Sequence, residues 1–334
     1  LKDLFERVKE WQMPAVACTD HGNMFGAIDF YTQALASGVK PIIGSEIYLT
    51  PGSRFDRSPP VKTQAAAAQD ALESGHRIYH LVLLCKNNLG YHNLCKLLTK
   101  AYLEGFYYRP RVDYALLEEY SEGLIASTAC LGGEIPQYIL AKQEERAEKA
   151  IIRMREIFKD DFYLELMDNG LGEQQKVNET IVSLAKKLSV PLIATNDCHY
   201  LNREDSLAQE VLLCIQTQKT LSDEHRMRME SDQFYFKSAT EMRSLFQLIP
   251  EACDNTLLVA EKCNLNLKWK DDKGHTIYHL PDFTIDTNER IEDYFARLAR
   301  EGLNKRFAGP HFINRRKEAN WESEIRLQYL RRLD

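Results

Sequence analysis

The sequence lacks the features that mark several large classes of protein. No apolar run in its 334 residues approaches the roughly 18 that a membrane span needs, and no charged and apolar leader opens it. Its eight cysteines are scattered, without a CxxC pair or the dense spacing of a disulfide scaffold. We therefore predict a soluble, cytoplasmic protein with reduced thiols and no membrane contact.

Several local site motifs are also missing. The chain contains no GxGxxG after an apolar run, no P-loop and no GxSxG, which argues against dinucleotide, P-loop and α/β-hydrolase sites. Its net charge of -6 lacks the basic footprint of a simple DNA-binding module. Two short basic patches, "YYRPR" at 107–111 and "NRRK" at 314–317, are either nucleic-acid contacts or ordinary solvated surface charge.

Short apolar runs alternate with segments of helical period, which is typical of βα units. A 44% hydrophobic content is enough for one large core and part of another domain. Polar residues follow several of the runs, as they do in barrels whose chemistry gathers at the strand ends. We therefore predict an α/β barrel with six parallel strands visible at 14–21, 41–49, 79–87, 123–130, 161–168 and 190–197.

Four amphipathic helices are expected between these strands, at 23–38, 88–104, 137–158 and 171–188. The segment 50–75 is rich in Pro, Gly, Ser and Ala and is predicted to be a surface loop. A second break lies at 267–283, after which helical patterns continue without another strand. We predict one domain over 1–268, then a linker and a mostly helical segment over 269–334.

The run "VPLIATNDCHYL" at 190–201 ends in three side chains that can bind metal. Side chains alternate along a strand, so Asp197 and His199 are predicted to share a face while Cys198 points away. A carboxylate and an imidazole together suit Zn²⁺, Mn²⁺ or Fe²⁺. The alternative is that both residues cap the next helix or bind loop backbone groups.

Similar residues recur on other predicted strands. Each has an ordinary explanation: a helix cap for Asp20, a paired charge for Glu46, a core imidazole for His80 and a small buried hydrophobe for Cys130. Their placement on different strands of one barrel would nevertheless bring them together. With open positions, such ligands activate water for hydrolysis of a phosphate ester. The candidate residues are Asp20, His21, Glu46, His80, Cys130, Asp197 and His199.

The chain resembles the amino-terminal PHP (polymerase and histidinol phosphatase) domain of the DNA polymerase III alpha subunit family, the DnaE type. "TDHGNM" and the D-x-H pair are shared by PHP phosphatases generally, whereas "GFYYRPRVD" and "FYFKSATEM" indicate the polymerase branch. The matching stretches, spread over residues 14–242, are "AVACTDHGNMFGAIDFY", "KPIIGSEIYL", "GFYYRPRVD", "STACLGGEIP", "ATNDCHYL" and "QFYFKSATEM". The segment from "HLPDF" onward is similar to the start of the polymerase palm.

The resemblance implies a distorted seven-stranded β/α barrel that holds a cluster of Zn or Mn ions, with the palm region following it. Asp20 would lie behind the ligands as an orienting carboxylate, and Cys198 would have no role. The ligands carried over by motif are His21, Glu46, His80, Cys130, Asp197 and His199. The parent protein would be a DNA-directed DNA polymerase, a nucleotidyltransferase of DNA replication, using Mg on primer-template DNA with other holoenzyme subunits.

Two departures from the family pattern bear on activity. The family's H-x-H-S motif, which supplies further ligands, is expected before Leu1, and the palm aspartates are expected beyond Asp334. The retained ligand positions favour a PHP domain capable of 3′-5′ exonuclease proofreading. The alternatives are a structural PHP domain that docks a separate proofreading exonuclease, and a free-standing phosphoesterase of the histidinol phosphatase kind.

Overall fold

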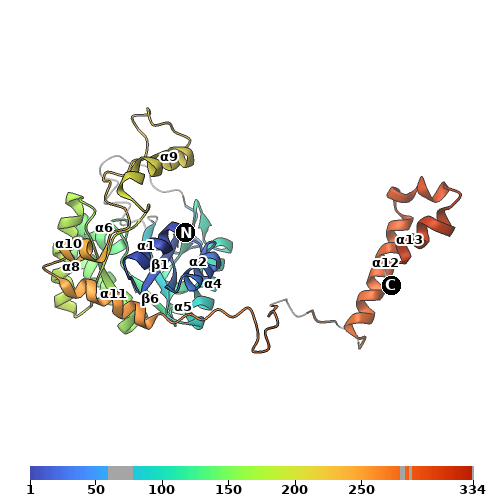
Figure 1. The fold of residues 1–334 in the computed structure, drawn as a ribbon, viewed down its shortest axis with the longest axis horizontal. Coiled ribbons are helices and arrows are strands. Elements are labelled where there is room, and N and C mark those ends of the chain that lie inside the picture. Colours follow the sequence, from blue (N-terminus) through green and yellow to red (C-terminus); the bar gives the residue numbers. More distant parts are fainter. Residues whose placement is uncertain (59–77, 279–282, 286–287, 333–334) are drawn as a thin grey trace. The chain divides into compact units, whose positions relative to one another are not determined.

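A computed structural model of the protein describes residues 1–58, 78–278, 283–285 and 288–332. The chain forms two compact units, Leu1–Leu267 and Lys268–Asp334 (Figure 1). The larger unit is a mixed α/β domain with a curled sheet, and the smaller is helical, so the predicted fold class is confirmed. The assignment of the two parts to a PHP domain and the start of a palm region stays a prediction.

The sheet of the larger unit has the strand order β4-β5-β2-β3-β6-β7-β8, with β1 also paired to β2. Parallel ladders join β1 to β2, β2 to β5, β6 to β7 and β7 to β8. The strands are β1 (Ala15–His21), β2 (Lys40–Leu49), β3 (Tyr79–Cys85), β4 (Phe106–Tyr107), β5 (Arg109–Val112), β6 (Leu124–Ser127), β7 (Phe162–Met167) and β8 (Leu192–Thr195).

Each of the six predicted strand regions contains a strand, but the prediction that all are parallel is wrong. β3 runs antiparallel to both of its neighbours, β2 and β6. Burial on both faces produces the same apolar run in either direction, so the pattern carries no information on strand direction. The short hairpin of β4 and β5 was also not predicted, because two-residue and four-residue strands give too little alternation.

The four predicted helical regions contain helices, and one of them is interrupted. The region 137–158 holds two helices, α6 and α7, separated where Lys142 takes a left-handed backbone conformation with φ of 59°. The helices of the larger unit are α1 (Lys2–Glu10), α2 (Ala27–Ala36), α4 (Asn88–Leu103), α5 (Tyr114–Tyr120), α6 (Glu134–Leu140), α7 (Glu144–Phe158), α8 (Gly172–Leu188), α9 (Ser206–Thr217), α10 (Ala239–Leu245) and α11 (Pro250–Lys262). Most of the loop predicted at 50–75 lies outside the described residues.

Alternation along the strands gives the sheet an inner face that is apolar at one end. There, one side chain from each of five strands packs against α11: Ile42, Leu84, Ile125, Tyr163 and Ile193. The residues that they meet at the end of α11 are Val259, Ala260 and Cys263. Asp161 fixes α11 in this place by accepting hydrogen bonds from Lys262 at 2.9 Å and from Lys86 at 2.6 Å. The opposite end of the inner face carries polar side chains, described below.

The smaller unit has its own aromatic cluster. Helix α12 (Ile291–Ala308) presents Phe307, which is buried and lies 5.5 Å from the Phe312 ring and 5.4 Å from the Trp321 ring. Helix α13 (Arg326–Leu330) adds Tyr329 at 5.4 Å from Phe312. Across the described residues of both units, none of the helices combines the length and apolar character that a bilayer crossing demands.

Candidate metal centre

The polar end of the inner face gathers ligand-type side chains from several strands. Along β2, Ile42 and Glu46 share this face, Ile42 toward α11 and Glu46 toward the other end. Along β7 and β8, Tyr163 and Ile193 are followed two residues later by Glu165 and Thr195. We call this end of the sheet, where β1, β2, β6, β7 and β8 end, the site edge.

The pairing of β1 with β2 places His21 beside Glu46. In the parallel ladder His21 is the register partner of Glu46, and its Nδ1 lies 3.3 Å from the Glu46 Oε1. The following Gly22 has φ of +66°, and an added Cβ there would lie 2.8 Å from the Tyr48 ring. A glycine is therefore required for the chain to turn immediately after this histidine.

His80 reaches the same place because β3 runs antiparallel. A parallel strand would have put the first residues of β3 at the far end of the sheet, but reversal brings its beginning to the site edge. The His80 Nδ1 lies 2.5 Å from Glu46 Oε1. His80 stands near the start of its predicted strand, so it reaches the other candidate ligands only because β3 is reversed.

Cys130 approaches His80 from the turn after β6. Its Sγ lies 3.5 Å from His80 Nδ1 and accepts a hydrogen bond from the Gly132 amide at 3.4 Å. A Cβ at Gly132 would meet His80 Nδ1 at 2.9 Å, so this turn has room only for glycine. One ligand atom from each of Glu46, His80 and Cys130 lies within 4.8 Å of the others, a spacing that could hold a metal ion.

Asp197 and His199 come from the segment after β8, and their predicted conformation was wrong. The strand ends at Thr195, and Asp197 has φ of 49°, so the two side chains are not placed by strand alternation. His199 Nδ1 lies 2.7 Å from the Asp197 carbonyl oxygen and 3.8 Å from its Oδ1, and the His199 ring lies 6.1 Å from the His21 ring. Cys198 contacts the Tyr235 carbonyl instead, with Sγ 3.6 Å away.

The segment 233–237 fixes this geometry. The side-chain amide of Asn196 donates to the Tyr235 carbonyl at 2.6 Å, and the backbone amide of His199 donates to the Phe234 carbonyl at 2.8 Å. The buried Lys237 donates to Asn196 Oδ1 at 2.9 Å. Residues of the motif "FYFKSATEM" thus fix the backbone around Asp197 and His199 by hydrogen bonds.

The environment of Glu46 fits a metal ligand. Its Oε1 is buried without a hydrogen bond of acceptable geometry among the described residues, although two imidazole nitrogens lie close to it. Such a buried acceptor needs a cation or a donor. Burial alone would raise the Glu46 pKa, but contact with His21 and His80 outweighs it and lowers that pKa to about 2. The same contact raises the pKa of His21.

Acidic groups lie close together around Glu46 and alter each other's pKa values. Burial, then the charges of Asp197 and Glu46, raise the pKa of the Cys130 thiol. Burial, reinforced by Glu46, also raises the pKa of Asp197 despite the opposing effect of His199. A divalent ion would reverse this balance, since a coordinating thiol is deprotonated outright. The donor set of carboxylate, imidazole and thiolate therefore suits a transition metal.

Glu165 is a buried polar residue of this region that the sequence had not singled out. Its Oε2 accepts hydrogen bonds from Ser127 Oγ at 2.6 Å and from the Ala129 amide at 2.9 Å, and its Oε1 accepts one from Thr195 Oγ1 at 2.5 Å. These donors lie just before Cys130 and Asp197 along the chain. The available signal was a single acid within the apolar strand "FYLELM".

Asp20 lies near the site, on β1 directly before His21. Its carboxylate accepts a contact from Cys18 Sγ at 3.6 Å and lies next to Gly26. Among the described residues, no hydrogen bond joins the Asp20 carboxylate to an imidazole. Its role as an orienting residue stays a prediction.

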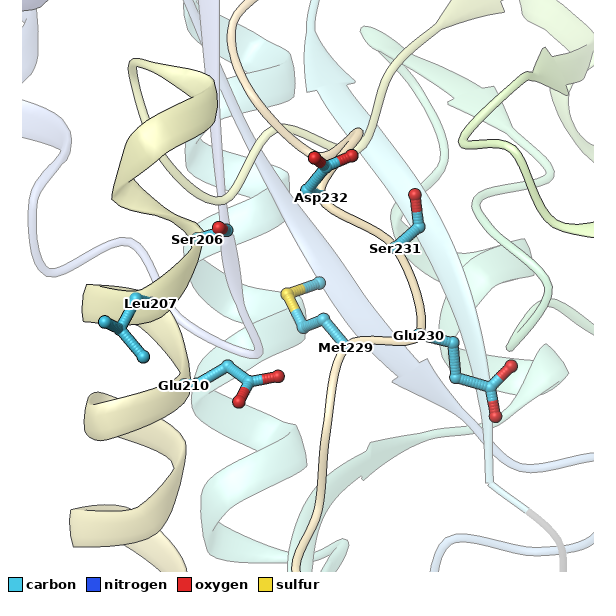
Figure 2. Close-up of a pocket in the computed structure, with 7 residues that line it drawn as sticks. All are labelled: Ser206, Leu207, Glu210, Met229, Glu230, Ser231 and Asp232. Carbon is cyan, nitrogen blue, oxygen red and sulfur yellow. The ribbon is translucent and has the colours of Figure 1, made fainter. Parts of the chain in front are cut away.

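A cavity of about 900 Å³ opens onto this cluster, and its lining includes Asp20, His21, Glu46, Glu165, Asp197 and His199. A smaller cavity of about 290 Å³ lies between α9 and residues 229–232, with Met229 between two acids, Glu210 and Glu230 (Figure 2). Its lining has neither histidine nor cysteine, and Glu210 is neutralised by Arg226 at 2.5 Å. The larger cavity therefore adjoins the candidate metal centre, although its lining does not include His80 or Cys130.

Comparison with known proteins identifies the family of the chain. Residues 1–169 match the PHP domain family. The chain is 46% identical over 310 residues to DNA polymerase III subunit alpha of Borreliella burgdorferi, covering 92% of the chain and 25% of that protein. The subunit alpha of Thermus aquaticus is 42% identical over 315 residues, 92% of the chain and 24% of that protein.

The corresponding protein of Campylobacter jejuni is 39% identical over 354 residues, 98% of the chain and 28% of that protein. The chain thus spans about a quarter of the length of these relatives, and the matched part is their amino-terminal region. The chain belongs to the PHP domain family, and it is homologous to the amino-terminal part of DNA polymerase III subunit alpha.

Proposed function

We propose that this chain is the amino-terminal part of a replicative DNA polymerase, and that its PHP domain is a metal-dependent phosphoesterase that removes nucleotides from a 3′ end. In the parent protein a separate palm site, using Mg, would extend primer-template DNA. Its partners would be DNA and the other holoenzyme subunits, with a proofreading exonuclease as a further docking partner. The relatives that carry the name DNA polymerase III subunit alpha support this assignment.

The observation that carries the phosphoesterase proposal is the buried Glu46 Oε1. It lies between His21 and His80 without a satisfactory hydrogen bond. A purely structural domain has no need of a buried carboxylate paired with two imidazoles, because an apolar group of similar size would avoid the desolvation of the charges. Ligand-type residues at all six described positions favour the active over the structural kind of PHP domain.

The residues suggest how the work is divided. His21, Glu46, His80 and Cys130 would hold zinc or manganese on one side of the cavity, and Asp197 with His199 on the other. Bound metal would supply Lewis acid stabilisation of a phosphoryl oxygen and an activated water. The protein itself contributes the cavity, which joins these ligands to the apolar inner face and leaves room for a substrate.

Metal content and hydrolysis of the full-length polymerase test the proposal. We expect bound zinc or manganese by elemental analysis, and a metal-dependent release of nucleotides from a labelled 3′ end that Glu46→Gln abolishes. Glu173→Gln, which removes an exposed acid of α8, should change neither result. A polymerase that contains no transition metal and shows no such release would instead support the structural alternative.

A further inference from the structure

The hairpin of β4 and β5 lies beside the candidate metal centre and has no part in the ligand set. Pairing of β5 with β2 joins it to the strand that carries Glu46. At Gly22, an added Cβ would lie 3.1 Å from the Pro110 ring and 2.8 Å from the Tyr48 ring. Because Gly22 directly follows His21, the hairpin and the metal centre share a wall.

The hairpin is firmly anchored. Arg111 is buried and donates to three backbone carbonyls, those of Gly105 at 3.0 Å, Arg54 at 2.9 Å and Asp56 at 2.6 Å. Its guanidinium also lies 5.3 Å from the centre of the Tyr107 ring. Of the two arginines in "YYRPR", one is therefore structural and holds the hairpin in place.

The turn of the hairpin holds an exposed aromatic residue, Tyr108, in an unfavourable backbone conformation. Tyr108 has φ of 60°, a conformation that bulky residues rarely adopt, and its side chain is 77% exposed. Phe106 is 49% exposed on the adjacent strand. The Tyr108 ring lies edge-on to the Tyr107 ring with ring centres 4.6 Å apart, and the Phe106 ring stacks on Tyr102 at 6.1 Å. These contacts leave both side chains exposed, and residues in a strained backbone conformation such as that of Tyr108 cluster at functional sites.

Arg109 supplies a positive charge beside these rings. Its guanidinium lies 5.3 Å from the centre of the Tyr48 ring, which in turn lies edge-on to His80 with ring centres 5.6 Å apart. Among the described residues, no carboxylate forms an ion pair with Arg109. Only the Tyr48 ring separates this arginine from His80, and a guanidinium without an acidic partner can bind a phosphate group.

We propose that the hairpin residues Phe106, Tyr108 and Arg109 form a binding site for the unpaired 3′ end of a DNA strand. Terminal bases would stack on the exposed rings, and a backbone phosphate would pair with Arg109. The site would guide the last phosphodiester bond to the metal centre. The inference rests on the proposed function for its choice of the 3′ end, whereas stacking and phosphate pairing follow from the hairpin itself.

Photocrosslinking to the chain tests the location without requiring hydrolysis. The probe is a fluorescein-labelled hexathymidylate whose 3′ nucleotide is 5-iododeoxyuridine. We expect the main crosslink to map to residues 106–108, and a probe iodinated at the 5′ nucleotide to give less. A main crosslink elsewhere, or equal capture of the two ends, would overturn the proposal.

Affinity of the same labelled strand, measured by fluorescence anisotropy, tests the residues. Tyr108→Asn removes the ring but keeps a residue that tolerates the left-handed turn, and it should weaken binding about 5- to 100-fold. Tyr108→Phe should bind within about twofold of the wild type, because stacking requires only the ring. Tyr278→Asn, which removes a comparably exposed tyrosine from the smaller unit, should bind like the wild type.

Arg109→Gln should weaken binding at low salt, with a difference that shrinks as salt rises. Unchanged binding by Tyr108→Asn, or a duplex end bound as tightly as the single strand, would refute the site. Failure of the proposed function looks different. Hydrolysis of bis(p-nitrophenyl) phosphate would then be absent while hairpin binding persists, whereas loss of hairpin binding alone would leave that hydrolysis intact.

Discussion

Glu165 gives the sharpest test of how the segments around the candidate metal centre are held. Its carboxylate accepts hydrogen bonds from the Ser127 hydroxyl, the Ala129 amide and the Thr195 hydroxyl. Glu165→Ala removes all of these acceptors. Each buried donor left unpaired costs about 1 to 3 kcal/mol. Because hydroxyl groups can rotate toward other acceptors, we expect a total near the lower bound, about 3 kcal/mol.

Glu165→Gln is the matched variant. It keeps one carbonyl oxygen for the Ala129 amide and loses the buried charge, so we expect a loss of about 1 kcal/mol or less. Burial, partly offset by hydrogen bonds, raises the folded-state pKa of Glu165. The wild type therefore loses stability as pH rises above the ordinary glutamate pKa. The glutamine variant does not titrate, so it should gain on the wild type over that window.

Urea unfolding measures these differences. Replacing Trp269 and Trp321 by Phe leaves Trp11, which stacks on Phe236 at 5.8 Å, as the fluorescent reporter of the larger unit. If the alanine and glutamine variants of Glu165 unfold within about 0.5 kcal/mol of each other, the accepted hydrogen bonds do not matter and the reasoning fails.

Three further outcomes are expected. Burial alone would raise the pKa of Asp161, but hydrogen bonds from Lys262 and Lys86 outweigh it and lower that pKa. The ionised carboxylate therefore stabilises the fold at neutral pH, and this stabilisation is lost as the pH falls through the folded-state pKa. Asp161→Asn should thus cost about 1 kcal/mol at pH 7, a gap that closes in acid unfolding curves. Gly90→Ala would place a Cβ 1.8 Å from the Gly123 carbonyl oxygen and should lower the melting temperature markedly, whereas Gly172→Ala, with open space around it, should not. Cys130→Ser should reduce zinc affinity more than manganese affinity in chelator competition, because a thiolate favours the softer ion.

The apolar runs located the strands correctly because buried strands are rich in apolar residues. Strand direction leaves no such trace in the sequence, and the antiparallel direction of β3 was therefore missed. The same reversal explains how His80, at the start of its strand, reaches Glu46. Pairing geometry that depends on the rest of the sheet cannot be read from the strand alone.

The D-x-H pair shows the opposite case. The sequence predicted that Cys198 points away from Asp197 and His199 by an argument from strand alternation, which does not apply because the strand ends at Thr195. The left-handed backbone at Asp197 is imposed by contacts with residues far along the chain. Glu165 was missed for a related reason, since one acid in an apolar strand acquires meaning only when its hydrogen-bond donors are known.

The candidate site forms only if β1 and β2 pair in one particular register, the one that places His21 beside Glu46. A shift of β1 by one residue would place Asp20 opposite Glu46 and turn His21 to the other face. Two carboxylates would then oppose each other where an acid and an imidazole now meet. A single inserted residue within β1 should therefore abolish metal binding while leaving the strands paired.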